Sequence, residues 1–327
     1  MKHLFTHRIA AVLLVWGFPG LAFAQNFHAD TAQIRQLITF CQHSMADEVL
    51  LLHHNQPIAH WRNPDCDSVY MGTASMVKSW TGLVLGCMID RRLIGSVDDP
   101  VCQYLPEWKP GCEKDVRIRH LLTMSGGLNR RGGRGVLSKA YMNAYVLQLS
   151  PDTFPDIRFS YSNESVQLLG MLMEKAAGKS GDQLFRECLF EPLGMDSTTL
   201  TRDSAGNVIF YGGCRTTVED AAQVGQLMLN KGLHNGRQIV SAPWIARSVS
   251  PSDRAPYYGF LWWLDNQSAH KNYAATGDLG QMTIVFPDLE LVFIRRQQCD
   301  LSPESVAMRW MGPDFLALLS STVKEGK

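Results

Sequence analysis

Several short motifs that would assign the chain to a familiar enzyme class are absent from its 327 residues. There is no G-x-S-x-G, the turn that exposes the nucleophile of α/β-hydrolases, and no H-E-x-x-H, which sets two zinc-binding histidines on one helix face. None of the eight cysteines forms a C-x-x-C pair, so a zinc ribbon or a thioredoxin-type site is not expected. These absences exclude the α/β-hydrolase, zinc-protease and thioredoxin-type classes.

An excess of charge of one sign and internal repeats are also lacking. The 31 basic and 31 acidic residues balance to a net charge of 0, which argues against nucleic acid or an anionic membrane surface as the main partner. No period of roughly 20–50 residues repeats, so solenoids and propellers are excluded. Since 45% of the residues are hydrophobic, the chain can bury a large core, and a small or neutral partner suits it best.

The first 24 residues have the order of a secretory signal. Lys2 and Arg8 precede an apolar run over residues 9–18, and the small-x-small triplet Ala22-Phe23-Ala24 follows it. The run is shorter than the roughly 20 residues that span a bilayer, and no cysteine stands at the cleavage point to take a lipid. We therefore predict cleavage after Ala24, a periplasmic or secreted protein, and no stable membrane anchor after cleavage.

All eight cysteines lie beyond that segment, an even number in a chain predicted to reach an oxidising compartment. Cys102 and Cys112 are the pair that we expect to form a disulfide, because two prolines and a glycine make the segment between them a loop. Cys87 stands inside an apolar helical pattern and is expected to be a buried free thiol.

The spacing of apolar residues predicts a sheet built from both ends of the chain. Residues 48–61 are expected to form two strands joined by a turn at Asn55-Gln56-Pro57, and residues 257–265 and 274–296 to form three more. Helical spacing is found over residues 31–41, 75–90, 116–124, 138–149, 163–177, 218–230 and 304–320.

The order of these elements is sheet, helical block, sheet. We therefore predict an α/β fold in which residues 25–98 and 206–327 form a sheet subdomain. Residues 99–205 are expected to form a helical subdomain inserted between the two parts, and no strands are evident there.

Residues 75–90 have apolar side chains on nearly every side, which is typical of a helix buried in a domain centre. S-x-x-K occurs three times, at Ser75 to Lys78, Ser268 to Lys271 and Ser321 to Lys324. About one match is expected by chance, but only Ser75 opens such a helix. Positions i and i+3 share a helix face, so the Lys78 amine can reach the Ser75 hydroxyl. The alternative is that Ser75 caps the helix and Lys78 is solvated.

Two later segments have residues that could complete a catalytic site built on Ser75. Tyr161-Ser162-Asn163 directly precedes a helical pattern, so Tyr161 could point from a loop into a cleft. Tyr141-Met142-Asn143 has the same spacing but lies inside a helical pattern. Ala275-Thr276-Gly277-Asp278 is expected at the start of a strand, where a glycine lets the backbone approach a ligand. A hairpin bend is the alternative for this last segment.

These three motifs together resemble the superfamily of serine β-lactamases and penicillin-binding proteins. Further similar stretches are LIGSVDDPVCQYLPEW, VRIRHLLTMSGGL, LFEPLGMDSTTL and YGFLWWL, so the resemblance covers residues 47–297. The tyrosine form of the second motif is similar to that of class C β-lactamases, D-aminopeptidases, esterases and 6-aminohexanoate-dimer hydrolases. The resemblance implies a β-lactamase/transpeptidase-like fold of the α+β class, an antiparallel sheet flanked by helices with an all-helical insertion.

The resemblance also implies roles for the residues of the first two motifs. Ser75 would be the acylated nucleophile, Lys78 the base that accepts its proton, and Tyr161 the proton carrier to the leaving group. Asn163 would orient the substrate. No cofactor and no metal is implied, and the partner would be a small-molecule amide or ester.

In the third motif, Thr276, Gly277 and Asp278 would bind the substrate. The backbone N–H groups of Ser75 and Asp278 would form the oxyanion hole. The chain departs from the family at Ala275, where β-lactamases and penicillin-binding proteins have Lys or His, so the cation that attracts a substrate carboxylate is missing. We therefore expect an amidase or esterase similar to 6-aminohexanoate-dimer hydrolases. The alternatives are a β-lactamase or D-Ala-D-Ala carboxypeptidase, and a non-catalytic relative that binds peptidoglycan or a protein.

Two smaller patterns lead to further expectations. His53, His54 and His60 do not predict a metal site, because neighbours on a strand point to opposite faces and no carboxylate pattern completes the set. Trp262 and Trp263 should also alternate across a strand, so one is expected in the core and the other beside the cleft.

Overall fold

The structure is a computed structural model that describes residues 27–129, 136, 139–297 and 312–325. The predicted signal segment, residues 1–24, lies outside the described residues, as do residues 304–311 of the closing helical pattern. None of the helices in the described ranges is both long enough and apolar enough to cross a bilayer.

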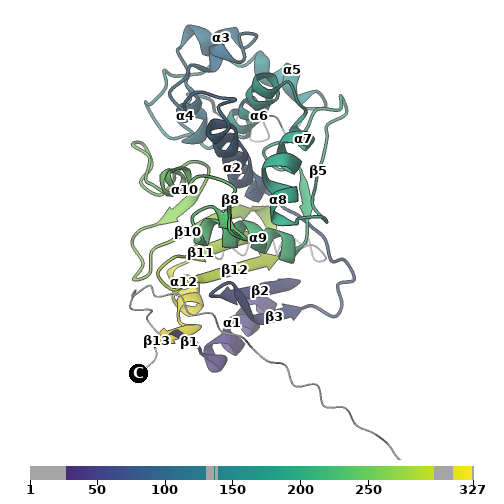
Figure 1. The fold of residues 1–327 in the computed structure, drawn as a ribbon, viewed down its shortest axis with the longest axis vertical. Coiled ribbons are helices and arrows are strands. Elements are labelled where there is room, and N and C mark those ends of the chain that lie inside the picture. The colour runs from purple at the N-terminus through teal and green to yellow at the C-terminus, as the bar shows by residue number, and fades with distance from the viewer. Residues whose placement is uncertain (1–26, 130–135, 137–138, 298–311, 326–327) are drawn as a thin grey trace, which may run out of the picture.

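A six-stranded antiparallel sheet in the order β3-β2-β12-β11-β10-β9 forms the lower part of the molecule (Figure 1). Its strands are β2 Glu48–His53, β3 Gln56–Arg62, β9 Trp263–Asp265, β10 Asn272–Gly277, β11 Gln281–Phe286 and β12 Leu291–Arg296. Because β2 pairs with β12, the sheet joins both ends of the chain, as predicted. Every residue of β2, β11 and β12 is buried, so both faces of the sheet are covered there.

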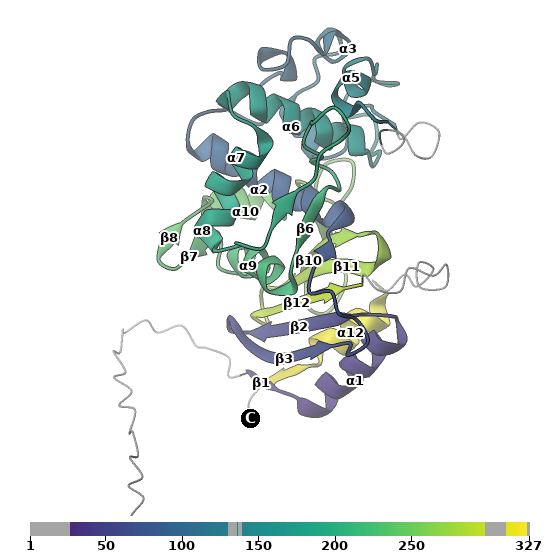
Figure 2. The ribbon, with the colours of Figure 1, turned by 90° about the vertical axis from the view of Figure 1, so that its right-hand side faces the viewer.

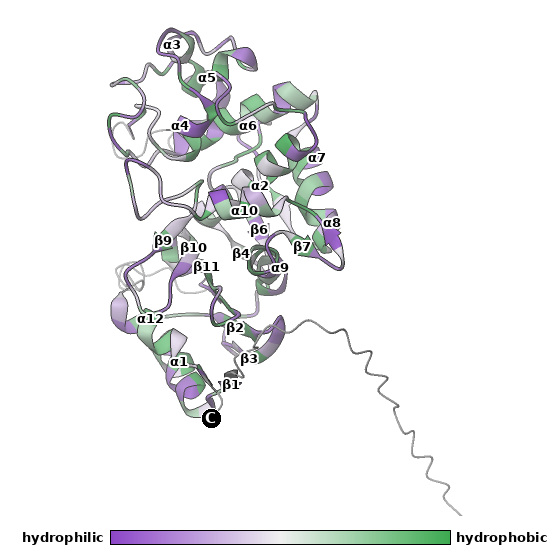
Figure 3. Cartoon of the chain, turned by 60° about the vertical axis from the view of Figure 1, so that its left-hand side comes forward, coloured by the Kyte–Doolittle hydropathy of each residue, from purple (hydrophilic) through white to green (hydrophobic). Residues whose placement is uncertain are grey.

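Alternate residues of these strands pack into two separate cores, as the two-residue period of a strand requires. Leu51 and Phe293 belong to one core, and Leu50 and Val292 to the other. The helices that cover the sheet are α1 Thr31–His43, α12 Pro313–Ser320 and α9 Val218–Leu229. Figure 2 shows α1 and α12 on one side of the sheet and α9 on the other. In Figure 3, α1 mixes hydrophobic and hydrophilic residues along its length, as a helix with one buried face does.

Helix α2 (Val77–Asp90) lies between the sheet and the helices at the opposite end of the molecule (Figure 1). Twelve of its 14 residues are buried, which confirms the prediction of a helix buried on nearly every side. A 3₁₀ turn over Ala74–Met76 precedes it. Ser75 therefore lies in this turn, just before the α-helix rather than inside it.

Most of the other helices cluster beyond α2 (Figure 1). They are α3 Lys109–Glu113, α4 Ile118–Leu122, α5 Met142–Leu147, α6 Asn163–Ala177 and α7 Gly181–Phe185. Helix α6 has the predicted bounds and ends at Gly178, whose φ of 62° gives the left-handed cap that favours glycine. The predicted subdomain boundaries, 98/99 and 205/206, stay a prediction.

Short elements connect these parts. They are β1 Phe27–Ala29, β4 Met71–Gly72, η2 Val101–Gln103, η4 Arg186–Phe190, α8 Glu191–Leu193, β5 Thr199–Leu200, β6 Cys214–Thr216, β7 Leu233–His234, β8 Arg237–Gln238, α10 Ala242–Ser248, η5 Asp278–Gly280 and β13 Val323–Glu325. Strand β5 pairs with β6, and β6 with β4, in a small sheet. Because β5 lies within residues 99–205, the expectation of no strand there is wrong. A strand of two residues is too short to show alternating apolar and polar residues in the sequence.

The turn of the first hairpin differs from the prediction by one residue. It consists of His54 and Asn55, with φ of 51° and 61°, and Pro57 lies within β3. Because β3 is an edge strand, a proline without an N–H group is tolerated there. His54 leaves the strand geometry, and its ring lies 4.0 Å from that of His53. The expectation that the two rings point to opposite faces is therefore wrong.

Residues 257–296 form four strands where three were expected. The backbone turns at Leu261, whose φ is 62°, so β9 begins only at Trp263. Strand β10 then forms separately from β11. The alternation of the two tryptophans is confirmed, because Trp262 is fully buried in the core and Trp263 is partly exposed.

The cysteine predictions agree with the structure. Cys102 and Cys112 form a disulfide with their Cα atoms 5.0 Å apart, and Cys87 is a buried free thiol. The disulfide closes the loop that leads into α3.

Candidate active site

The turn that carries Ser75 has a strained backbone. Ala74 adopts a φ of 45°, in the left-handed region that alanine rarely enters. The end of β10 passes directly against this turn. A Cβ atom at Gly277 would lie 2.3 Å from the Thr73 carbonyl oxygen and 3.1 Å from the Ser75 nitrogen. Only glycine therefore lets β10 come this close to the Ser75 N–H group.

Lys78 is buried directly behind Ser75, with 1% of its surface exposed. Its Nζ donates to Ser75 Oγ at 2.7 Å and to the Tyr211 carbonyl oxygen at 2.6 Å. The expected contact between positions i and i+3 is thus formed. The alternative reading is wrong on both counts, since Lys78 is not solvated and Ser75 makes no capping bond to α2. Burial disfavours the charged form of an amine.

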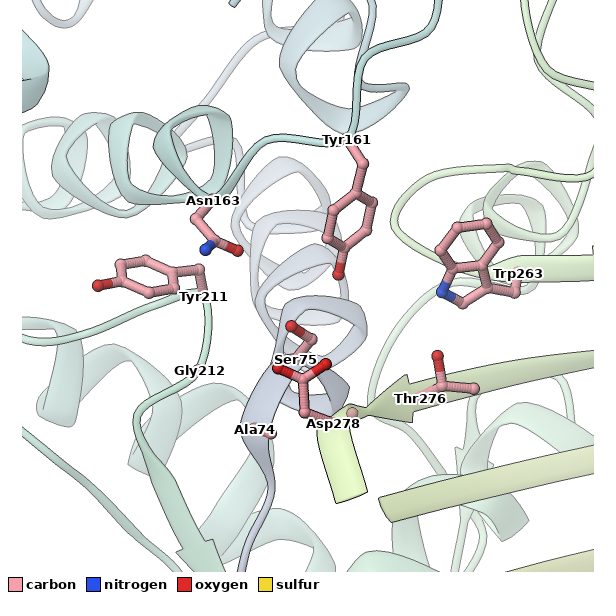
Figure 4. Close-up of a pocket in the computed structure, with 10 residues that line it drawn as sticks. Ala74, Ser75, Tyr161, Asn163, Tyr211, Gly212, Trp263, Thr276 and Asp278 are labelled. Carbon is pink, nitrogen blue, oxygen red and sulfur yellow. The ribbon is translucent and has the colours of Figure 1, made fainter. Parts of the chain in front are cut away.

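Two tyrosines, Tyr161 and Tyr211, lie beside this pair, and a third, Tyr258, contacts Tyr161. Lys78 Nζ is 5.1 Å from the ring centroid of Tyr161, which precedes α6 in a loop, as predicted. Figure 4 shows the Tyr161 hydroxyl pointing toward Ser75. The Tyr211 hydroxyl instead contacts Met142 Sδ at 3.1 Å, and burial raises the pKa of Tyr211. Burial also raises the pKa of Tyr258, with a smaller contribution from nearby Tyr161.

Asn163 is the first residue of α6 and is 5% exposed. The preceding residue, Ser162, caps the helix by accepting a hydrogen bond from the Ser165 N–H at 3.1 Å. This cap ends the loop at Tyr161 and begins the helix at Asn163. Both residues of the Tyr-x-Asn motif line the same pocket.

The third motif lies at the end of β10 and in the turn to β11, not at the start of a strand. The expectation that this motif starts a strand is therefore wrong. The alternative, a hairpin bend, is correct, because Gly277 pairs with Gln281 across the turn. Arg295, 1% exposed on β12, donates to the Gly280 carbonyl oxygen at 2.8 Å and to that of Ser44. This buried guanidinium holds the turn in place.

A cavity of about 350 Å³ lies over Ser75 (Figure 4). It is lined by Ala74, Ser75, Tyr161, Asn163, Tyr211, Gly212, Trp263, Thr276, Gly277 and Asp278. Six of the seven predicted site residues are in this lining, and the seventh, Lys78, bonds to Ser75 from behind. The contribution of Tyr211 was missed. Tyr211 accepts the Lys78 hydrogen bond through its backbone carbonyl oxygen. Every residue has this group, so the sequence does not reveal the contact.

An aromatic wall bounds one side of the pocket. The ring of Trp263 stacks on Tyr161 with centroids 5.7 Å apart and on Tyr257 with centroids 6.4 Å apart. Tyr258 meets Trp263 edge to face at 4.8 Å. The expectation that one tryptophan of the pair lies beside the cleft is confirmed.

One group in the described part of the chain has the spacing of metal ligands: Glu48, His60 and Glu219. Glu48 already accepts hydrogen bonds from His60 Nε2 at 2.8 Å and from Arg296 Nε at 2.7 Å. A guanidinium beside the carboxylate opposes a metal cation there. The absence of a metal stays a prediction.

Comparison with known proteins places the chain in a family. Residues 46–311 match the sequence profile described as Beta-lactamase. The chain is 31% identical over 139 residues to a beta-lactamase of Yersinia enterocolitica, covering 42% of this chain and 36% of that protein. It is 24% identical over 241 residues to a 6-aminohexanoate-dimer hydrolase of Paenarthrobacter ureafaciens, covering 65% and 59%. The chain thus spans well under two thirds of the length of these relatives.

Solved structures agree on the fold. EstCE1, a hydrolase with promiscuous acyltransferase activity, superposes with a TM-score of 0.71 over 89% of this chain and 97% of its own, at 17% identity. A penicillin-binding protein homologue from Pyrococcus abyssi gives a TM-score of 0.67 over 84% and 75%, at 19% identity. The fold is therefore β-lactamase/transpeptidase-like, as predicted. With the match over residues 46–311, the chain belongs to the beta-lactamase family.

The contact between β10 and the Ser75 turn leads to a testable prediction. If the backbone N–H groups of Ser75 and Asp278 form the expected oxyanion hole, Gly277→Ala should lower kcat/KM by about 10²–10³-fold, because the added Cβ pushes the strand away from the Ser75 N–H. The measurement is ester turnover together with thermal unfolding. Gly72→Ala is the matched control, since a Cβ there meets nothing within 4 Å. Equal activity of the two variants would contradict the close approach.

Proposed function

We propose that the protein is a serine hydrolase that cleaves a small amide or ester through an acyl-enzyme on Ser75. The observation that carries this proposal is the 2.7 Å hydrogen bond from the buried Lys78 amine to Ser75 Oγ. Family membership supports it, because the Ser-x-x-Lys pair of this family is the one found here at the head of α2.

Acylation would proceed from this geometry. Lys78 Nζ takes the hydroxyl proton while Ser75 Oγ forms a bond to the substrate carbonyl carbon. The carbonyl oxygen gains the negative charge and is held by the backbone N–H groups of Ser75 and Asp278, worth about 3–4 kcal/mol for each donor. Tyr161 then delivers a proton to the leaving nitrogen or oxygen as that bond breaks, and the proton taken up by Lys78 passes to Tyr161, which restores the pair. Asn163 orients the substrate beside the two proton carriers.

Deacylation would use the same groups in reverse. A water molecule loses a proton to the Lys78–Tyr161 pair and attacks the acyl carbon, and Ser75 Oγ leaves with a returned proton. The products are a carboxylic acid and the amine or alcohol released in the first step. No cofactor takes part in these reaction steps.

We propose an amidase or esterase in preference to a β-lactamase. Ala275 is fully buried on β10 and carries no cation for a substrate carboxylate. A 6-aminohexanoate-dimer hydrolase among the relatives and EstCE1 among the similar folds support this choice. Hydrolysis of β-lactams or D-Ala-D-Ala peptides is the second candidate, favoured by the name of the matching family.

The periplasmic or secreted location is also a proposal. The disulfide between Cys102 and Cys112 supports it, because such bonds persist in oxidising compartments. Cell fractionation with an antibody against the mature chain tests it. Recovery of the protein in the cytoplasmic fraction alone would contradict it.

A set of three probes tests the function. The purified protein and Ser75→Ala are each incubated with a fluorophosphonate, a fluorescent penicillin and p-nitrophenyl butyrate. We expect fluorophosphonate labelling and ester turnover in the wild type, and neither in the variant. Labelling by penicillin without ester turnover would favour the second candidate. If wild type and variant behave alike with all three, the protein is a non-catalytic relative.

The role of Tyr161 predicts a difference between amides and activated esters. Tyr161→Phe should lower kcat for an anilide by about 10²–10⁴-fold, since the amine must be protonated as it leaves. The loss for p-nitrophenyl butyrate should be at least tenfold smaller, because p-nitrophenolate leaves without a proton. Parallel initial rates on both substrates measure this. An equal loss on both would assign Tyr161 to substrate binding rather than proton transfer.

A further inference from the structure

Two free thiols lie next to each other in the interior, far apart in the chain. Cys87 belongs to α2 and Cys188 to the π-helical turn η4, and each has 1% of its surface exposed. Their side chains share a hydrogen bond, so the two sulfur atoms are in direct contact. Turns of the π-helical kind are rare and recur at functional sites. The steps proposed for the hydrolase use neither thiol.

The two elements that carry these thiols are held together on both sides of the pair. Near the start of α2, the rings of Trp80 and Phe190 meet edge to face with centroids 6.5 Å apart. Just beyond the end of α2, Arg91 donates to the Glu187 carbonyl oxygen at 2.9 Å. Figure 1 shows α7 and α8, the helices that flank η4, beside α2. This packing keeps the thiols in contact, which is the condition for a disulfide bond.

A cavity of about 370 Å³ gives access to the pair. Cys87 lines it, together with Asp90, Arg91 and Arg237 among others. The described residues of its lining include none that line the Ser75 pocket. Its volume lies within the range of small-molecule sites. The two arginines bring positive charge to the cavity, and positive charge beside a thiol favours the reactive thiolate.

The hydrogen bond between the thiols prepares one of them for reaction. It stabilises the thiolate of Cys188, so the pKa of Cys188 lies below its usual value. The same bond raises the pKa of Cys87, which keeps the proton. Cys188 is therefore the first of the two to become a thiolate, the form that attacks a disulfide.

We propose that Cys87 and Cys188 form a further disulfide when the protein meets a small-molecule disulfide such as oxidised glutathione. The Cys188 thiolate attacks one sulfur of the oxidant, which forms a mixed disulfide and releases one thiolate. Cys87 then gives up its proton, its sulfur attacks that of Cys188, and the second thiolate of the oxidant leaves. The pair of cysteines loses two electrons and two protons, and the oxidant is reduced to two thiols.

The bond would act as a staple on the helix that follows Ser75. It would close a loop of about 100 residues, against a sequence separation of 10 for Cys102 and Cys112, and the entropy removed from the unfolded chain grows with the loop. Since α2 also carries Lys78, oxidation would stabilise the element on which the Ser75 pocket depends.

Peptide mapping tests the bond directly. The folded protein is treated with oxidised glutathione, quenched with acid, alkylated in denaturant to trap the remaining thiols, and digested. We expect mass spectrometry to find a pair of peptides joined through Cys87 and Cys188. The bond between Cys102 and Cys112 is the internal control, because its recovery shows that disulfides survive the digestion.

Thermal unfolding measures the effect of the bond on the fold. The midpoint is compared with oxidised glutathione and with a phosphine reductant, in the wild type and in two variants. The rise on oxidation should be larger in the wild type than in Cys188→Ala by at least about 5 °C, as the loop length implies. Cys41→Ala is the matched control, since it also removes a buried free thiol, and it should keep the wild-type rise.

Three results would overturn the inference. They are a digest that contains the Cys102–Cys112 bond but no Cys87–Cys188 link, glutathione attached to either thiol without that link, and an equal rise on oxidation in the wild type and Cys188→Ala. None of them bears on the proposed hydrolase, whose test depends on Ser75.

Discussion

Lys78→Met is expected to lower kcat by about 10⁴-fold or more on any substrate of the enzyme, since a nucleophile and its base act as one unit. Methionine fills nearly the same buried volume without an amine, so the packing of α2 should be kept. The measurement is initial ester turnover, with circular dichroism to confirm the fold. Lys78 bonds to Ser75, the proposed nucleophile, so this is the largest catalytic effect expected after removal of Ser75 itself.

Lys271→Met is the matched control for that substitution. Lys271 follows Ser268 with the same spacing, but it is exposed. Its replacement should leave kcat within about twofold, as for a surface site away from special features. A Lys78→Met variant as active as Lys271→Met would contradict the assignment of Lys78 as the base.

Glu48→Ala is expected to destabilise the fold by about 3–5 kcal/mol, the loss seen when one partner of a buried ion pair is removed. Glu48 Oε2 accepts from Arg296 Nε at 2.7 Å, with the two side chains 4% and 0% exposed. The truncation leaves the Arg296 guanidinium buried without that carboxylate. Urea denaturation measures the change in the free energy of unfolding. Equal slopes of that free energy against urea concentration would show that both proteins expose the same surface area on unfolding.

Two further variants make the result specific to burial. Glu107→Ala breaks the exposed ion pair with Lys175. The Lys175 side chain is 57% exposed and that of Glu107 is 44% exposed, so the free energy of unfolding should fall by less than about 1 kcal/mol. The double variant Glu48→Leu/Arg296→Met removes both buried charges and should be more stable than Glu48→Ala. If Glu48→Ala and Glu107→Ala lose equal stability, the buried pair contributes no more than a surface one.

The sequence was sufficient to predict the contact between Ser75 and Lys78 because the information is local. Ser75 and Lys78 are three residues apart, and the apolar residues around them identified a buried helix in which that spacing brings the side chains together. Tyr161 was found for the same reason, since Ser162 caps the helix that follows it. Both inferences depended on chain segments of fewer than twenty residues.

Contacts between distant segments could not be derived in this way. The Tyr211 carbonyl that accepts from Lys78 Nζ is 133 residues away in sequence. A backbone group offers no residue type to recognise. The close approach of Gly277 to Ser75 is of the same kind, because it depends on how β10 meets the turn before α2.

The strand errors have a backbone cause. A continuous apolar pattern over residues 257–265 predicted one strand, but Leu261 adopts a φ of 62° and turns the chain. Non-glycine residues rarely take this conformation, so periodicity alone does not reveal it. The shift of the third motif from the start of one strand to the end of another follows from the same miscount of strands.

The central claim is that Ser75 becomes acylated during turnover. The most direct measurement is rapid acid quenching of a reaction with p-nitrophenyl butyrate, followed by mass spectrometry of the proteolysed protein. The account predicts one butyryl group, on the peptide that contains Ser75, and no such adduct in Ser75→Ala. Turnover of the ester by Ser75→Ala at the wild-type rate, or an adduct on any other residue, would contradict it.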